Sequence, residues 1–304
     1  MLYRVPSHPD LKRIVIINPK GGAGKSTLAT NVAGFLSSSG HPAALMDFDP
    51  QGSSMRWLQN RSGERPEVYG IAACEHDPTM TRSFQMRVPH QFRYLVIDTP
   101  AALQAPDLVE FTRGAHAILV PVLPSDIDIH AAIQLLSDLL IVAKVSRRMG
   151  RLGIVANRVR ENTVGYRKLR RFVECLSIAV VGELRDSQNY IYASDQGLSI
   201  HEMQPSRVRK DLDSWKTIVA WLESRLETEL TPRDLFHPQK QVQKLVQKPA
   251  PTLTAVAVEP VNRAAGLPLN AGPRFSGSAG KSPAAPLNPG CEPPLLDSVR
   301  DRAE

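Results

Sequence analysis

The feature that most constrains this chain is a glycine-rich segment between an apolar run and a helical pattern. The segment reads Lys-Gly-Gly-Ala-Gly-Lys-Ser-Thr over residues 20–27 and follows the apolar run 14–17. Glycines let backbone N–H groups turn toward an anion without an obstructing Cβ atom, and the N-terminus of the following helix adds its positive dipole end. A strand, a glycine-rich turn and a helix in this order predict a phosphate-binding loop.

Two side chains of this loop have separate expected tasks. Lys25 brings a point charge to the β and γ phosphates of a nucleotide, and the Ser26 hydroxyl can ligate Mg²⁺. The general phosphate-loop pattern has a glycine where this chain has Pro19, but the physical requirements are still met. The expected nucleotide contacts are Gly21, Gly22, Ala23, Gly24, Lys25, Ser26 and Thr27.

Beyond the loop, short apolar runs alternate with helical patterns. Their Val, Ile and Leu content suits strands that are covered on both faces. The expected fold class is therefore α/β, a doubly wound, mostly parallel sheet of the P-loop NTPase type with helices on both faces. The strands are expected at residues 14–17, 43–48, 94–97, 117–122, 153–156 and 179–182.

Three helices can be placed from the sequence. One follows the loop and stops at Gly40. A second begins at a capping pair, Ser125 with Asp128, before the apolar-periodic stretch 129–145. The last is expected over about residues 206–230, with an apolar stripe on its buried side.

The composition changes near residue 231. Beyond it come repeated prolines with much Ala, Gly and Ser and few aromatic residues. Such a segment buries too little apolar surface to offset the entropy lost on ordering. We expect a folded P-loop domain over residues 1–235 and a disordered tail over 236–304, which is either an inert appendage or a partner-binding segment.

The charge and the cysteine content limit which class of protein this can be. The formal net charge is +7, which favours an anionic partner such as nucleic acid or an acidic membrane surface. No uncharged run reaches the roughly 18 apolar residues that a membrane span needs. The cysteines lie far apart without metal-ligand spacing, which suits a reducing cytoplasm. They are Cys74, Cys175 and Cys291.

The loop resembles that of the ParA/MinD family of ATPases, which has the form K-G-G-x-G-K-[ST]. Lys20 stands at the signature lysine position of that pattern. In the family this lysine reaches across an ATP-bound dimer to the phosphates of the partner subunit. The resemblance therefore implies an ATP-dependent homodimer and a catalytic role for Lys20. The alternative for Lys20 is one more loop cation attracted by phosphate charge.

Two acidic strand ends also resemble the family. Residues 45–53 are similar to its D-x-D-P-Q-G element, and residues 94–100 are similar to its Walker B strand and switch segment. Alternate residues of a strand point the same way, so Asp47 and Asp49 are both expected to face the phosphates. We assign Asp49 to the attacking water, Asp47 to the Mg²⁺ shell, with the reverse also open, and Asp98 to Mg²⁺ through water.

Smaller similarities continue along the chain. Residues 156–158 resemble the strand end whose asparagine contacts adenine, so Asn157 is the base-contact candidate; the alternative is a simple turn asparagine. Residues 120–125 resemble the V-P-V-x-P-S element of the family. Residues 193–207 resemble its C-terminal elements, although one glutamate is absent. The resemblance covers about residues 12–230.

Positive charge gathers over residues 147–171 and again at Arg207, Arg209 and Lys210. Such a surface can neutralise several phosphates without reading base edges, whereas solvated surface charge is the alternative for any single residue. Many family members sit on the nucleoid when bound to ATP, so the resemblance implies non-specific DNA binding. Arg207 stands at the family's P-x-S-K position and is the strongest candidate.

The function expected from these features is an ATP-driven positioning switch. It would be a cytoplasmic, nucleoid-associated, Mg²⁺-dependent ATP hydrolase that dimerises with ATP, binds DNA and acts with a ParB-like or small cargo-adaptor protein. A plasmid, a chromosome or a protein compartment such as a carboxysome would each suit as cargo. Because the chain begins close to its phosphate loop, no N-terminal helix-turn-helix and no operator binding are expected.

Three other functions compete with this one. A MinD-like membrane regulator needs an amphipathic C-terminal helix, and only residues 242–246 have a short apolar rhythm. A static DNA-bound scaffold with incidental ATPase activity is separated from a switch by whether DNA and partner stimulate turnover. Iron–sulfur electron transfer needs a cysteine near the Walker B segment, and none lies between Asp98 and Cys175.

Overall fold

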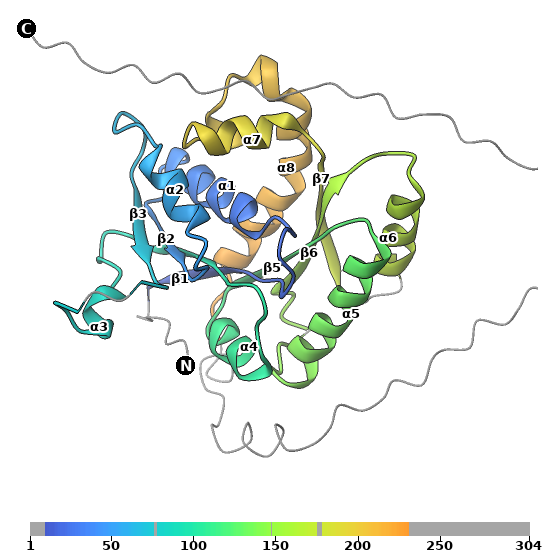
Figure 1. Cartoon of the computed structure of the whole chain (residues 1–304), viewed down its shortest axis with the longest axis horizontal. Helices are drawn as coiled ribbons and strands as arrows, with labels where there is room; N and C mark the ends of the chain where they lie inside the picture. The colour runs from blue at the N-terminus through green and yellow to red at the C-terminus, as the bar shows by residue number, and fades with distance from the viewer. Residues whose placement is uncertain (1–9, 76–77, 147, 175–177, 231–304) are drawn as a thin grey trace, which may run out of the picture. The chain divides into compact units, whose positions relative to one another are not determined.

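The structure is a computed structural model that describes residues 10–75, 78–146, 148–174 and 178–230. Within these residues, seven strands form one all-parallel sheet in the order β3-β2-β4-β1-β5-β6-β7 (Figure 1). This is the α/β fold class that the sequence predicts. The expected domain boundary near residue 235 and the tail over 236–304 lie outside the described residues.

Six of the strands lie where the apolar runs predict them, within one to three residues at each end. β3 was missed because it is a sheet edge with an exposed glycine, Gly70, and partly exposed neighbours, so it has no continuous apolar run. The strands are β1 (Lys12–Ile16), β2 (Ala43–Asp47), β3 (Val68–Ala72), β4 (Tyr94–Asp98), β5 (Ala117–Val122), β6 (Leu152–Val159) and β7 (Ala179–Arg185).

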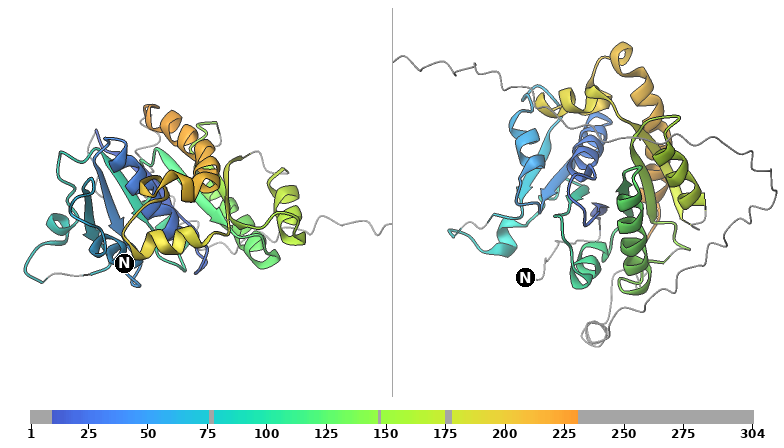
Figure 2. Two further views of the ribbon diagram at one scale, coloured as in Figure 1. Left: turned by 90° about the horizontal axis from the view of Figure 1, so that it is seen from above. Right: turned by 45° about the vertical axis from the view of Figure 1, so that its right-hand side comes forward.

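Helices cover both faces of the sheet (Figure 2), because strand residues alternate between two apolar cores. In β1, Ile14 and Ile16 face one core, whereas Val15 faces the other. The first core is covered by α1 (Lys25–Ser38), α2 (Ser53–Gln59), α7 (Gln188–Asp195), the 3₁₀ turn η1 (Ile200–Glu202) and α8 (Pro205–Leu226); the second by α4 (Ala105–Thr112), α5 (Asp126–Ile141) and α6 (Val164–Glu174).

The expected helix signals are confirmed for α1, α5 and α8. Ser125 caps α5 by accepting the Asp128 N–H at 3.2 Å, and Trp215 and Ile218 of α8 are fully buried. The short helix α3 (Arg82–Gln85) lies in the connection between β3 and β4. None of the described helices has the length and apolar content that a membrane span requires.

The strand order sets where a ligand can bind. The chain winds outward from β1 to β2 and β3, returns to β4, and then continues on the other side of β1 through β5, β6 and β7. In open parallel sheets, ligands bind outside the carboxyl ends of the strands where the winding direction reverses. The loop that follows β1 lies at this position.

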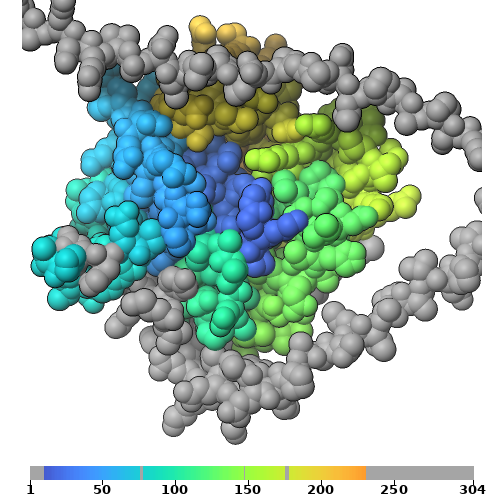
Figure 3. Space-filling model, viewed as in Figure 1, coloured from blue at the N-terminus to red at the C-terminus, as the bar shows by residue number. Residues whose placement is uncertain are grey.

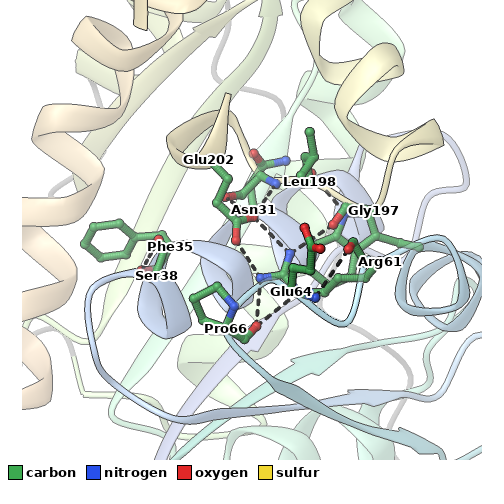
Figure 4. Close-up of polar contacts among 12 residues, drawn as sticks. Asn31, Phe35, Ser38, Arg61, Glu64, Pro66, Gly197, Leu198 and Glu202 are labelled. Carbon is green, nitrogen blue, oxygen red and sulfur yellow. Dashed lines mark hydrogen bonds and ion pairs between the residues drawn. The ribbon is translucent and has the colours of Figure 1, made fainter. Parts of the chain in front are cut away.

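A buried ion pair fixes the segment that precedes α8 (Figure 4). Arg61, in the loop after α2, contacts Glu202 at 2.5 Å and donates to the Gly197 carbonyl at 2.9 Å, and both charged side chains are at most 5% exposed. On the other side, Asn31 of α1 accepts the Ile200 N–H at 2.8 Å. Removing one partner of such a pair costs about 3–5 kcal/mol. The network thus holds η1 and the segment after α7 against the loop after α2 and against α1.

His201 makes the stability of the fold depend on pH. Its ring packs against Phe35 at 4.7 Å and Trp215 at 5.4 Å between centroids, and burial lowers its pKa from 6.5 to about 4. Between pH 6.5 and 4 the unfolded chain therefore takes up a proton that the folded chain excludes. As the pH is lowered through this window, His201 should decrease the free energy of unfolding by up to about 1.4 kcal/mol per pH unit, while Asp98, whose pKa is raised to about 7, acts in the opposite direction. Urea unfolding of the wild type and of a His201 variant, compared at each pH, isolates the His201 contribution.

The substitution His201→Phe keeps the aromatic contacts and removes the titration, so the stability of the variant relative to the wild type should increase as the pH is lowered from 6.5 to 4. His130→Asn is the matched control, because His130 is exposed on α5. If the unfolding free energy of H201F falls from pH 7 to pH 5 as steeply as that of the wild type, another group is responsible.

Candidate nucleotide-binding site

The phosphate loop, residues 20–27, leads from β1 into α1, which begins at Lys25. Gly24 is the N-cap of α1 and adopts a left-handed conformation with φ of 91°. A Cβ atom there would also lie 2.1 Å from Nδ2 of Asn157. The same amide nitrogen donates to the Ala23 carbonyl at 2.8 Å. Glycine is therefore required at position 24 by both backbone conformation and space.

The beginning of the loop is held by two other parts of the chain. Asn18 accepts the Lys20 N–H at 2.9 Å and donates to the Pro121 carbonyl of β5 at 2.7 Å. The Ala102 N–H, in the segment after β4, donates to the Pro19 carbonyl at 2.7 Å. Ala102 has φ of 56°, which is uncommon for a residue other than glycine. The segment after β4 is thus coupled to the loop through the backbone.

Two neighbouring cavities open at the loop. The loop cavity, about 620 Å³, is lined by the phosphate loop, the turn after β2 and the segment after β4. The side cavity, about 290 Å³, lies between the ends of β6 and β7 and helix α7. Thr27, Arg158 and Ser194 line both. In Figure 3 the blue segment that carries the loop reaches the surface between the green segment of α4 and α5 and the yellow segment of α7.

The two loop lysines have different environments. Lys25 is buried and its Nζ donates to the Lys20 carbonyl at 3.3 Å; burial lowers the pKa of Lys25, while Asp98 and Asp49 oppose that shift. The Nζ of Lys20 lies 2.6 Å from Oδ1 of Asp128 in α5, with side chains 35% and 7% exposed. The sequence marked Asp128 only as a helix cap, so this ion pair was not anticipated.

The two carboxylates after β2 also differ. Asp47 is fully buried and accepts the N–H groups of Asp49 at 2.9 Å, Ser54 at 3.0 Å and Met55 at 3.3 Å. Asp49 lines the loop cavity and accepts the Gln51 N–H at 3.0 Å. The two side chains diverge because β2 ends at Asp47 and Asp49 already belongs to the next turn.

Asp98, at the end of β4, is a buried carboxyl. The Ser54 hydroxyl donates to Oδ2 of Asp98 at 2.8 Å. The other carboxyl oxygen, Oδ1, is buried and accepts no hydrogen bond from the described residues. Burial, and next the charge of Asp47, raise the pKa of Asp98 to about 7, while the Ser26 and Ser54 hydroxyls oppose the shift. A buried carboxylate oxygen beside a hydroxyl fits a hard cation, which would favour the ionised form.

Asp98 and Ser26 therefore fit Mg²⁺ as part of a larger shell. The described part of the chain holds no group of three or more His, Cys, Asp or Glu side chains that could bind an ion by themselves. Mg²⁺ commonly uses one or two protein ligands and completes its shell with water and substrate phosphates. The residues at this site match that mode of binding.

Asn157 lies between the loop and the side cavity, but both ends of its amide are used within the chain. Nδ2 donates to Ala23 and Oδ1 accepts the Arg158 N–H at 3.0 Å. Sequence reasoning missed Arg158 and Ser194 as cleft residues. Arg158 could have been identified from its place directly after the candidate asparagine. Ser194 could have been identified from the motif over residues 193–207.

The basic residues do not form one surface. Arg207, Arg209 and Lys210 are exposed near the start of α8, and the Arg207 guanidinium lies 3.9 Å from the ring centroid of Tyr192. In the earlier group, Arg151 is buried and donates to the Ala115 carbonyl at 2.8 Å, so it is not available to a partner.

Other residues of the earlier group are neutralised by carboxylates. Arg160 pairs with Asp186 at 2.5 Å, and Lys168 pairs with Asp126 at 2.6 Å. On α6, Arg170 pairs with Glu174 at 3.7 Å. The start of α8 is therefore the better candidate for a polyanion surface.

Comparisons with known proteins agree with this geometry. The family model described as the CobQ/CobB/MinD/ParA nucleotide binding domain matches residues 14–200. The "Maintenance of carboxysome distribution protein A" of Halothiobacillus neapolitanus is 26% identical over 191 residues, which is 62% of this chain and 87% of that protein.

Two solved structures have the same fold. The ATP complex of a Cyanothece McdA variant aligns with a TM-score of 0.54 at 17% identity, over 74% of this chain and all of that chain. A putative plasmid partition protein (BB_S35) of Borrelia burgdorferi bound to AMPPNP aligns with a TM-score of 0.51 at 13% identity, over 69% of this chain and 99% of that chain.

Proposed function

The chain belongs to the CobQ/CobB/MinD/ParA nucleotide-binding family, and we propose that it is a Mg²⁺-dependent ATPase that dimerises around ATP and positions a cargo on nucleoid DNA. The observation that carries this proposal is the loop cavity, which has the phosphate loop on one side and Asp49 on the other, with Lys20 on the loop itself.

The proposed chemistry uses groups that surround this cavity. The loop backbone and Lys25 bind the phosphates, and Ser26 and Asp98 hold Mg²⁺. When bound, Mg²⁺ offsets the charge of the phosphate oxygens. Asp49 polarises the attacking water, because its carboxylate faces the cavity, whereas the oxygens of Asp47 are engaged by backbone N–H groups. Asp47 then shapes the turn that presents Asp49.

The dimer is proposed from the position of Lys20. Its side chain is one-third exposed and its partner in the free chain, Asp128, lies on a different element. A lysine at this position can leave the ion pair and approach phosphates that a second subunit presents. Because the Lys20 side chain is one-third exposed, solvent screens the pair and its contribution is about 1 kcal/mol, so exchanging it for a phosphate contact is not opposed by a large energy.

The cargo is proposed from the relatives. The sequence relative whose name refers to carboxysome distribution is matched over most of its length, and a solved neighbour is described as a plasmid partition protein. These names support cargo positioning, and we propose a ParB-like or small adaptor protein as the partner. A protein compartment is the first cargo to test, by following its spacing in cells that carry the Asp49→Ala variant.

DNA binding is proposed for the start of α8. We expect that replacing both Arg207 and Arg209 with alanine lowers DNA retention in the presence of ATP and reduces the slope of log affinity against log salt by about 2, one for each lost phosphate contact. Retention on immobilised DNA over a series of salt concentrations, in ATP and in ADP, measures both quantities.

The matched control is the double substitution of Arg160 and Lys168 with alanine. It removes the same charge, but both residues are neutralised by carboxylates, so retention should stay close to that of the wild type. Equal loss of retention in the two double variants would mean that net charge, rather than the surface at α8, is responsible. Unchanged retention in R207A/R209A would remove the assignment of this surface.

A further inference from the structure

A bulge re-aims the backbone at the end of β6. The pairing of β6 with β7 shifts register between Ala156 and Val159, and Arg158 within this bulge has φ of 51°. A left-handed residue other than glycine costs roughly 1–2 kcal/mol, and bulges beside binding sites commonly redirect a side chain. The Asn157 side chain stabilises the bulge by accepting the Arg158 N–H at 3.0 Å. The chain therefore maintains a strained conformation at this arginine.

The side chain of Arg158 is exposed and lines both the loop cavity and the side cavity. Two neighbouring arginines are engaged by carboxylates: Arg160, two residues further along the chain, by Asp186 at 2.5 Å, and Arg185, which lines the side cavity, by Asp211 at 2.6 Å. Arg158 has no hydrogen bond or ion pair from its guanidinium to any described residue. Of these three arginines, it is the one available to a ligand.

We propose that the Arg158 guanidinium binds the α-phosphate of the nucleotide, an inference that rests on the proposed function. A nucleotide with its terminal phosphates in the loop cavity and its base in the side cavity carries the α-phosphate where the two cavities meet. Arg158, Thr27 and Ser194 line both cavities, and the planar guanidinium suits two phosphate oxygens. Arg158 is thus a positioning residue for the whole nucleotide.

The test is Arg158→Asn, because asparagine tolerates the left-handed conformation and the substitution removes the charge. We expect the affinity for ATP and for ADP to fall by the same factor, about tenfold, since both carry an α-phosphate and a charge-assisted hydrogen bond at an exposed site lies at the low end of its range. Affinity for adenosine should not change. Calorimetric titration of the full chain gives all three values.

Arg160→Asn is the matched control, two residues along the same strand end, and should bind ATP as the wild type does. Arg158→Gly relieves the backbone strain and should give the same tenfold loss, so a folding defect of R158N cannot imitate the result. Unchanged ATP and ADP affinities in both variants would overturn the inference, and so would a loss for ATP alone, which indicates a γ-phosphate contact. If the wild type itself binds no ATP, the proposed function fails first.

Discussion

Replacing Gly24 with alanine should lower the affinity for ATP by about 5- to 140-fold, because holding alanine in the left-handed conformation of the binding loop costs about 1–3 kcal/mol. The added Cβ atom would also displace the Asn157 amide, which lies 2.1 Å from its position. The hydrogen bond from Asn157 to the Ala23 carbonyl, which holds the loop, would be lost with it. Calorimetric titration with ATP measures the affinity, and thermal unfolding measures the accompanying loss of stability.

Gly63→Ala is the matched control for this substitution. Gly63 lies in an exposed turn, nothing lies within 4 Å of a Cβ atom built there, and its φ is not in the left-handed region. Its alanine variant should melt and bind ATP as the wild type does. ATP affinity and melting temperature that are equal in G24A and the wild type would contradict the requirement for glycine at position 24.

The second large effect is expected for Lys20→Ala. Its ATP hydrolysis rate should fall by about 100-fold or more, because removing one group that stabilises charge in a transition state typically has an effect of this size. ATP affinity should change much less, because Lys25 and the loop backbone remain. The variant should also stay monomeric in ATP, since the proposed contact with the partner subunit is gone. Hydrolysis rate, ATP affinity and molar mass in ATP are the three measurements.

Asp128→Asn separates this role of Lys20 from its ion pair. The substitution weakens the contact that holds Lys20 in the free chain but leaves a side chain that can still accept the hydroxyl of Ser125, the N-cap of α5. Each subunit gives up one such pair on dimerising, so we expect the ATP-bound dimer of this variant to form at about 30-fold lower protein concentration, from two contributions of about 1 kcal/mol each. A monomeric K20A variant that hydrolyses ATP at the wild-type rate would remove the reason for assigning a dimer switch.

Much of the fold could be predicted because local patterns and tertiary structure agree along most of the chain. The apolar run 117–122 is β5 residue for residue, and the Ser125 cap begins α5 as expected. The resemblance to the ParA/MinD family is confirmed by the family match over residues 14–200. The glycine-rich loop was the strongest signal, since few structures other than a phosphate site require that order of residues.

What could not be predicted depends on contacts between distant residues. Nothing local marks Asp128 as a partner of Lys20, because the two are brought together only when α5 packs beside the loop that follows β1. The bulge at Arg158 arises from the register of β6 against β7. Asp47 and Asp49 diverge because the strand ends between them, and strand ends are the least certain feature of a sequence-based prediction.

The central claim is that ATP closes this chain into a dimer, and the molar mass of the Asp49→Ala variant tests it most directly. With hydrolysis blocked, the variant should remain ATP-bound during light scattering coupled to gel filtration. We expect twice the chain mass of 33.5 kDa in ATP and Mg²⁺, and a single chain mass in ADP. A single chain mass in both nucleotides, with ATP binding demonstrated, would contradict it.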